Sequence, residues 1–200
     1  MSSTSGPVPS ELRIERVPFT HPDARLLDEQ VQAEYVVRYG TPDLTHIDPT
    51  QFDAPVGAFY VGYRDATPVT MGGWRFRTDV TRLGSERAVE VKRMYVAPTA
   101  RRGGLARLML AHLEATARTA GADVVLLETG IRQPEAMTLY ESSGYERIEP
   151  FGYYRAHRSN RCYGRVLGAA DVSARLPPTQ SPQAELQPST ECAGRGDGPV

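Results

Sequence analysis

The feature that most constrains the fold is the order of patterns between residues 88 and 127. A strand-like segment over 88–96 is followed by a helical stripe, which ends before Gly121 and consists of Ala106, Met109, Leu110, Leu113 and Ala117. The segment over 124–127 is entirely apolar, as is typical of a central strand in a parallel sheet. Strand, helix and strand together predict a right-handed βαβ crossover and therefore an α/β fold.

The segments around this unit predict a sheet that is mixed rather than fully parallel. Residues 59–63 and 69–77 read as strands on either side of a turn at 65–68, which indicates an antiparallel hairpin. Shorter strands are expected over 12–17, 145–148 and 162–167, and helices between Pro22 and Gly40 and over 134–142.

The strand over 88–96 contains an irregular alternation. Val89 and Val91 occupy odd positions, whereas Met94 and Val96 occupy even ones. A β-bulge near residues 92–93 would bring all four side chains to one face, because one extra residue shifts the alternation by one. Alternatively, the strand is buried on both faces and the alternation carries no information. The pattern favours the bulge.

Composition limits the class of protein. The chain has 200 residues, of which 40% are hydrophobic, and its 23 basic and 24 acidic residues leave a net charge of -1. This balance argues against a nucleic-acid binder and against a basic membrane-surface protein. Neither a signal peptide nor an apolar run long enough to span a bilayer is recognisable, so we expect a cytoplasmic protein. Two cysteines and four scattered histidines indicate neither a disulfide framework nor a metal site.

The two ends of the chain differ from its middle. Residues 169–200 contain five prolines, three glycines and no aromatic residue, and residues 1–10 are rich in Ser and Pro. Such segments cannot bury enough apolar surface to offset the entropy lost on ordering. We therefore expect one domain over 11–168, with disordered segments over 1–10 and 169–200.

The loop before the central helix has the composition of an anion site. Arg101, Arg102, Gly103 and Gly104 stand directly before the helix. A helix N-terminus offers unpaired N–H groups and the positive end of the helix dipole, and glycines let a ligand approach the backbone closely. A solvated helix start has the same composition. The loop alone therefore leaves both a polyphosphate site and an ordinary helix start open.

The same loop resembles the signature of a known family. Residues 101–106 (RRGGLA) are similar to the Q/R-x-x-G-x-G/A signature of the GNAT superfamily of acetyl-CoA-dependent N-acetyltransferases. Residues 90–98 (EVKRMYVAP) resemble the fourth strand of that family, and residues 139–145 (LYESSGY) resemble its L-Y-x-x-x-G-F/Y segment. In element order the resemblance runs from about residue 12 to 167, and it is sharpest over 88–147.

This resemblance implies a fold, a co-substrate and the residues that bind it. The implied fold is a GNAT-like mixed sheet, mostly antiparallel, with two splayed parallel strands and helices on both faces. The implied co-substrate is acetyl-CoA. Its pyrophosphate would be bound by N–H groups of the signature loop, and its pantetheine arm would lie along the main chain after the bulge. The implied binding residues are Arg101, Arg102, Gly103, Gly104, Leu105, Ala106, Met94, Tyr95, Val96 and Gln133. Gln133 stands where many members have Asn.

Tyr140 matches the general acid of the family. A phenol with a pKa of about 10 stays protonated at neutral pH and can donate a proton to a departing thiolate. Tyr140 also ends a short helix that must pack, so an ordinary core aromatic is the alternative. Backbone N–H groups around Tyr95 and Val96 are expected to polarise the thioester carbonyl.

The base is the less defined catalytic group. Glu90 stands where some relatives carry a catalytic carboxylate, and Glu128, at the end of the apolar strand, is its rival. A free carboxylate has a pKa of about 4.3 and an ammonium group about 10.4, so either glutamate needs burial or a water relay to accept the proton. A reaction without a dedicated base remains the third possibility.

The expected reaction is direct attack of an amine on acetyl-CoA within a ternary complex. The acceptor is a small-molecule or peptide amine, and candidate walls for its pocket are Tyr35, Tyr39, Trp74 and Tyr154. The one macromolecular partner left open is a second copy of the chain, as a homodimer. Two other functions compete: a coenzyme A-binding module without turnover, and a protein that binds the phosphates of a different nucleotide.

Overall fold

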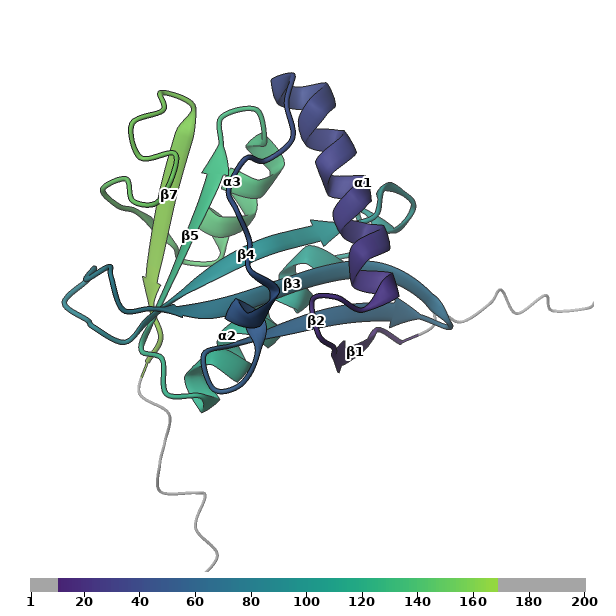
Figure 1. Ribbon diagram of the computed structural model, residues 1–200, viewed down its shortest axis with the longest axis horizontal. Helices are drawn as coiled ribbons and strands as arrows, with labels where there is room; N and C mark the ends of the chain where they lie inside the picture. Colours follow the sequence, from purple (N-terminus) through teal and green to yellow (C-terminus); the bar gives the residue numbers. More distant parts are fainter. Residues whose placement is uncertain (1–10, 169–200) are drawn as a thin grey trace, which may run out of the picture. The chain divides into compact units, whose positions relative to one another are not determined.

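The computed structural model describes residues 11–168, which form one seven-stranded sheet flanked by helices (Figure 1). The segments expected to be disordered, 1–10 and 169–200, lie outside the described residues. The strands are β1 (Arg13–Arg16), β2 (Gly57–Arg64), β3 (Thr67–Arg77), β4 (Ala88–Val96), β5 (Val124–Gly130), β6 (Glu146–Arg147) and β7 (Asn160–Val166). The α-helices are α1 (Pro22–Tyr39), α2 (Leu105–Thr119) and α3 (Pro134–Ser142), and the short 3-10 helices are η1 (Pro49–Phe52) and η2 (Pro98–Ala100).

The strand order confirms the expected mixed sheet. The strands follow the order β1-β2-β3-β4-β5-β7-β6, and only β4 and β5 are parallel neighbours. The predicted hairpin is β2 and β3, and α2 connects the parallel pair. The predicted strand over 145–148 is shorter than expected: β6 consists of Glu146 and Arg147, and the N–H of Tyr145 instead donates to the carbonyl of Tyr140 in α3.

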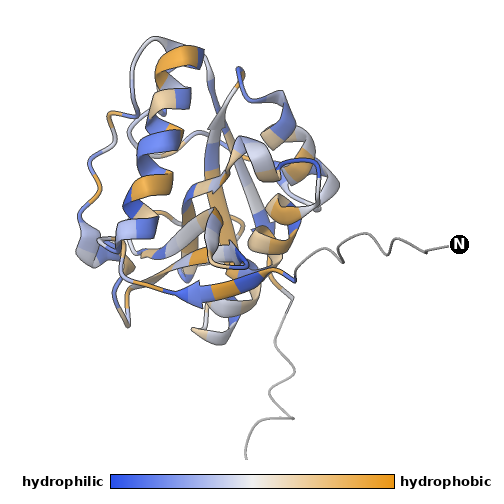
Figure 2. Cartoon of the chain, turned by 90° about the vertical axis from the view of Figure 1, so that its right-hand side faces the viewer, coloured by the Kyte–Doolittle hydropathy of each residue, from blue (hydrophilic) through white to orange (hydrophobic). Residues whose placement is uncertain are grey.

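The long helix α1 has recognisable ends. Nδ1 of His21 accepts a hydrogen bond from the backbone N–H of Asp23 at 3.2 Å, and Gly40 ends the helix with φ +84°. Ala24, Leu27 and Val31 are its buried residues, spaced three and four apart as one face of a helix requires. Hydrophobic and hydrophilic residues follow one another along this helix in Figure 2. None of the helices between residues 11 and 168 combines the length and apolar character needed to cross a membrane.

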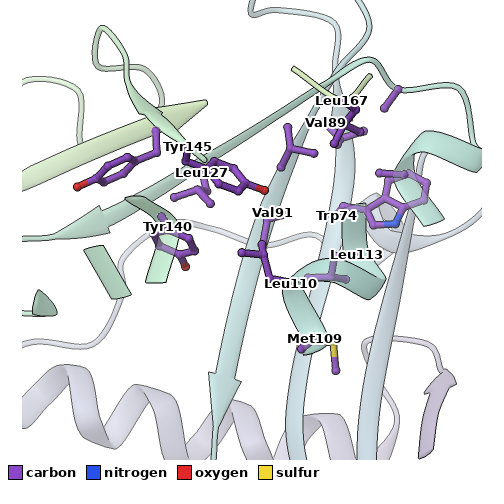
Figure 3. Close-up of a cluster of buried hydrophobic side chains, with 14 of the residues drawn as sticks. Trp74, Val89, Val91, Met109, Leu110, Leu113, Leu127, Tyr140, Tyr145 and Leu167 are labelled. Atoms are coloured by element: carbon purple, nitrogen blue, oxygen red, sulfur yellow. The ribbon is translucent and has the colours of Figure 1, made fainter. Parts of the chain in front are cut away.

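The helices cover opposite faces of the sheet. On one face, α1 packs against Phe59, Val61 and Met71 of the hairpin. On the other face, α2 and Tyr140 of α3 pack against β4 and β5 in the largest apolar cluster (Figure 3). In Figure 1, α1 accordingly runs in front of the strands. The expected arrangement of helices on both faces is confirmed.

The predicted bulge in β4 is confirmed and lies at Arg93. Between the pairs Gly73–Lys92 and Met71–Tyr95, β4 has one more residue than β3, and Arg93 takes a positive φ of 55°. As a result Met94 packs against the same cluster as Val89 and Val91. The extra residue has therefore restored the apolar face of the strand.

Past the paired region, β4 and β5 part. Their parallel pairing covers only 88–91 with 124–127, although both strands continue beyond it. Figure 1 shows the two arrows diverging from this closed end into a V, with α3 near its opening. The sheet is thus held together at one end of β4 and β5 and open at the other.

Candidate active site

The loop from β4 to α2 presents an uncapped helix N-terminus. Arg102 and Gly104 both have positive φ, 65° and 76°, and α2 begins directly after Gly104. The first turn of α2 receives no side-chain capping hydrogen bond, so its N–H groups are available to an anion. A Cβ on Gly104 would meet no atom within 4 Å, which leaves the approach to this backbone open.

The arginines of the loop have separate roles. Nε of Arg101 donates to the carbonyl of Val96 at 3.0 Å, and the Arg101 guanidinium also pairs with Glu34 of α1. It lies 5.6 Å from the centre of the Tyr95 ring. Arg102 is exposed, beside the uncapped turn. Arg101 therefore ties the loop to α1, while Arg102 is free to meet a ligand.

Arg64, at the end of β2, is a cation beside this loop that sequence reasoning missed. Its Nη2 lies 3.1 Å from the position that a Cβ on Gly103 would occupy. Its Nε is buried without a hydrogen-bond partner. A buried N–H group without an acceptor is costly, so the site suits an anion. Arg64 is far from Gly103 in the sequence, and only the strand order brings the two together.

Residues 94–96 form an open strand edge. Tyr95 and Val96 pair with Met71 and Thr70 of β3, and Thr70 Oγ1 donates to the carbonyl of Tyr95 at 2.7 Å. On the other side, the pairing with β5 has already ended at Val91. An unpaired edge of this kind can bind an extended ligand through main-chain groups. Of the described residues, none between 94 and 106 lines either of the two cavities below.

Tyr140 lies at the opening between the two strands. It is 6% exposed and shares a cluster with Val91 and Leu127, the last paired residues of β4 and β5 (Figure 3). Burial raises the pKa of its hydroxyl above the usual 10, and the nearby phenols of Tyr35 and Tyr163 raise it further. The hydroxyl therefore stays protonated at neutral pH.

A first cavity of about 350 Å³ lies between α1, the end of β5 and the loop that follows β6. Three of the candidate walls of the acceptor pocket, Tyr35, Tyr39 and Tyr154, line this cavity. Gln133 also lines it and accepts a hydrogen bond from Thr129 Oγ1 at 3.1 Å. The expectation for Trp74 was wrong. Its side chain is on the α2 face of the sheet, where Nε1 donates to Thr116 Oγ1 at 3.0 Å.

Glu90 is at the centre of a buried ion-pair network. Arg75 Nη2 and Arg77 Nη1 lie 2.9 and 2.6 Å from its Oε2, and Lys92 Nζ lies 3.2 Å from its Oε1. Burial alone would raise the pKa of Glu90, but the charges of Lys92, Arg75 and Arg77 outweigh burial and lower it. A carboxylate held in this way is a poor proton acceptor.

Glu128 has a different environment. Burial raises its pKa above the usual value, partly opposed by Lys92, whose Nζ lies 3.7 Å from Oε2. Asn160 Nδ2 donates to Oε1 at 3.0 Å. Gly152 lets the loop after β6 pass directly over this carboxylate, because a Cβ there would lie 2.7 Å from Oε2. Glu128 lines the first cavity, whereas Glu90 does not.

A second cavity of about 460 Å³ adjoins the first, and Lys92 and Glu128 line both. It is bounded by the loop after β3 and the loop after β6, and it contains Glu90 in its wall. Within residues 11–168, no group of three or more His, Cys, Asp or Glu side chains is arranged to hold a metal ion.

Comparisons with known proteins can now be set beside this geometry. The model of the acetyltransferase (GNAT) family matches residues 25–145. The IAA acetyltransferase of Azospirillum brasilense is 48% identical over 65 residues, which make up 32% of this chain and 42% of that protein. The alignment thus spans less than half of that relative.

Solved structures share the fold. A Klebsiella pneumoniae protein assigned as an acyl-CoA N-acyltransferase superposes with a TM-score of 0.63 at 24% identity, covering 78% of this chain and 97% of that one. A Bacillus subtilis acetyltransferase in complex with CoA gives a TM-score of 0.55 at 16% identity, covering 78% and 99%. Since the family model spans more than half of the sequence, the chain belongs to the acetyltransferase (GNAT) family.

Proposed function

We propose that the protein is an N-acetyltransferase that moves the acetyl group of acetyl-CoA to an amine by direct attack within a ternary complex. The observation that carries this proposal is the parting of β4 and β5 beyond Val91 and Leu127, with Tyr140 at the opening. Family membership supports the use of an acyl-CoA. The acetyl group and the amine acceptor are our inference.

The described residues fit a bound coenzyme. The uncapped N-terminus of α2, the open approach at Gly104 and the orphaned Nε of Arg64 together suit a pyrophosphate. We assign this group to the backbone of Arg101–Ala106, with Arg102 and Arg64 supplying charge. The edge of Met94–Val96 would pair with the pantetheine arm, and Gln133 would contact it near the first cavity.

Acetyl-CoA supplies an activated thioester, and side chains of the protein would accept and donate the protons. Backbone N–H groups near Tyr95 and Val96 would polarise the carbonyl. Glu128, directly or through a water, would accept the proton of the attacking amine. The C–N bond forms as the C–S bond breaks, and the Tyr140 hydroxyl would donate its proton to the departing sulfur.

We assign the base role to Glu128 instead of Glu90. The raised pKa of Glu128 brings it closer to that of an amine, whereas the pKa of Glu90 is lowered by three cations. Efficiency of proton transfer improves as the pKa of the base approaches that of the group it deprotonates. Glu90 then has a structural role: it holds Arg75, Arg77 and Lys92 in place.

The test is to supply acetyl-CoA with a panel of amines and to measure the release of free thiol. Tyr140→Phe is expected to lower kcat by about 10²-fold or more, because general acid catalysis contributes 10² to 10⁴, while the Kd of acetyl-CoA stays unchanged. Glu128→Gln should lower kcat/KM and abolish the fall of kcat/KM at acidic pH that protonation of Glu128 causes in the wild type. Thermal stabilisation by acetyl-CoA without thiol release from any amine would instead indicate a coenzyme A-binding module.

A further inference from the structure

The second cavity is lined by more basic than acidic side chains, and not all of the basic ones are in ion pairs. Its charged lining comprises five cations and three carboxylates: Arg75, Arg77, Arg82, Lys92, Arg155, Asp79, Glu90 and Glu128. The ion pairs involve Arg75, Arg77 and Lys92, which share Glu90, and Arg77 also binds Asp79. Lys92 reaches Glu128 as well. The carboxylates of the cavity are therefore already engaged.

Two guanidinium groups at this cavity have no carboxylate partner among the described residues. Arg82 donates only to the carbonyl of Thr81, at 2.9 Å, and its Nε is buried without any acceptor. The guanidinium of Arg155 makes a single long contact, from Nη1 to the carbonyl of Gly152 at 3.4 Å. The two residues stand on different loops, one after β3 and one after β6, that meet around the same cavity. Guanidinium groups so placed are suited to a carboxylate or a phosphate.

We propose that this cavity binds the acidic group of the acceptor. The acceptor is then an amine that also carries a carboxylate or phosphate, held between Arg82 and Arg155 while the amine lies beside Glu128. This inference rests on the proposed function, since the amine becomes the attacking group only in an acetyltransferase. Because Glu128 and Lys92 line both cavities, one small molecule can reach from the acid subsite to the base.

The binding test uses inorganic phosphate as the probe and the full chain with coenzyme A at saturation, so that the loop before α2 is filled. We expect phosphate to bind, and Arg82→Gln and Arg155→Gln each to weaken it about tenfold, the factor that one charge-assisted hydrogen bond supplies. Arg158→Gln is the matched control, because Arg158 is exposed on the same loop as Arg155 but lines neither cavity. Equal affinity for phosphate in the wild type and all three variants would overturn the proposal.

The kinetic test compares amines in pairs, each with and without an acidic group, such as an amino acid against its amide and phosphoethanolamine against ethanolamine. We expect the acidic member to have the higher kcat/KM, and Arg82→Gln and Arg155→Gln to reduce that preference about tenfold. Equal rates within every pair would overturn the inference but leave the proposed function standing. Phosphate binding that needs both arginines, with no thiol release from any amine, would support the subsite and count against the proposed function.

Discussion

At the scale of single residues, Glu90 shows how ion pairs can make a candidate base a poor proton acceptor. Its side chain is 1% exposed and faces three cations, whereas Asp79, which shares Arg77 with it, is 67% exposed. Glu90→Gln would leave Arg75, Arg77 and Lys92 without their shared counter-charge. We expect a loss of about 3–5 kcal/mol in the free energy of unfolding, measured with denaturant. Asp79→Asn, the control, should cost about 1 kcal/mol or less.

The ion pairs of Glu90 also predict how the free energy of unfolding depends on pH. The folded pKa of Glu90 is lowered, so its stabilisation is complete above the unfolded value of about 4.3. It is lost as the pH falls through the folded value. The difference in stability between the wild type and Glu90→Gln should therefore be constant near neutral pH and shrink below about pH 4. A difference that instead grew at acidic pH would contradict the ion-pair role.

At the scale of elements, the start of α2 depends on a positive φ at Gly104, which glycine adopts without strain. Its φ of +76° is strained for other residues, although a Cβ there would touch nothing within 4 Å. We expect Gly104→Ala to cost about 1–2 kcal/mol of stability and to raise the Kd of acetyl-CoA about tenfold, since the N–H groups of the loop would shift. Calorimetric titration measures the Kd.

Gly84 offers a matched control for that prediction. It also has φ +76°, and a Cβ added there would likewise meet nothing within 4 Å, but it lies in the turn between β3 and β4. Gly84→Ala should cost similar stability and leave the Kd of acetyl-CoA unchanged. If both variants weakened acetyl-CoA equally, the effect would come from general destabilisation and not from the loop.

The bulge in β4 places Arg93 beside the first cavity, where we propose that the acceptor binds. Its Nε lies 3.2 Å from Asp28 of α1 and its Nη1 lies 3.1 Å from Asp43, although neither contact has hydrogen-bond alignment. Asp43 also accepts a hydrogen bond from the hydroxyl of Tyr154, a wall of the first cavity, at 2.9 Å. Arg93→Gln should therefore raise the KM for the amine about tenfold, or about 1.4 kcal/mol, and leave the Kd of acetyl-CoA unchanged.

Steady-state kinetics with varied amine and direct titration with acetyl-CoA separate these two quantities. Arg25→Gln is a suitable control, since Arg25 is exposed on α1. A Kd for acetyl-CoA that rose in parallel with the KM would mean that Arg93 supports the whole opening rather than its acceptor side.

Local patterns predicted the elements, but they could not predict the surroundings of the candidate site residues. The limits of β4, the bulge and the crossover follow from alternation and helical spacing within about 40 residues of sequence, because those signals depend on neighbours in the chain. The surroundings of Glu90 depend instead on pairing with β3, which sets Arg75 directly opposite. Arg64 beside Gly103 and Gly152 over Glu128 are likewise contacts between distant segments.

At the scale of the whole molecule, the sheet consists of two parts joined by a short seam. Strands β1–β4 and strands β5–β7 are directly paired only through 88–91 and 124–127. One apolar cluster, with Met109, Leu110 and Leu113 of α2, packs against both sides of that seam. The core thus contacts both parts of the sheet beside their paired residues, while the other ends of β4 and β5 are not paired with each other.

This architecture predicts where acetyl-CoA changes hydrogen exchange. Residues 88–91 pair on both sides, whereas Tyr95 and Val96 pair only with β3. At exchange times of seconds to minutes, acetyl-CoA should slow exchange over 94–96 and at the start of α2, because a bound pantetheine arm would pair with the open edge. Residues 88–91 should be protected with or without it. Protection confined to the start of α2 would mean that the coenzyme is held by its phosphates alone and that the opening between β4 and β5 is not its path.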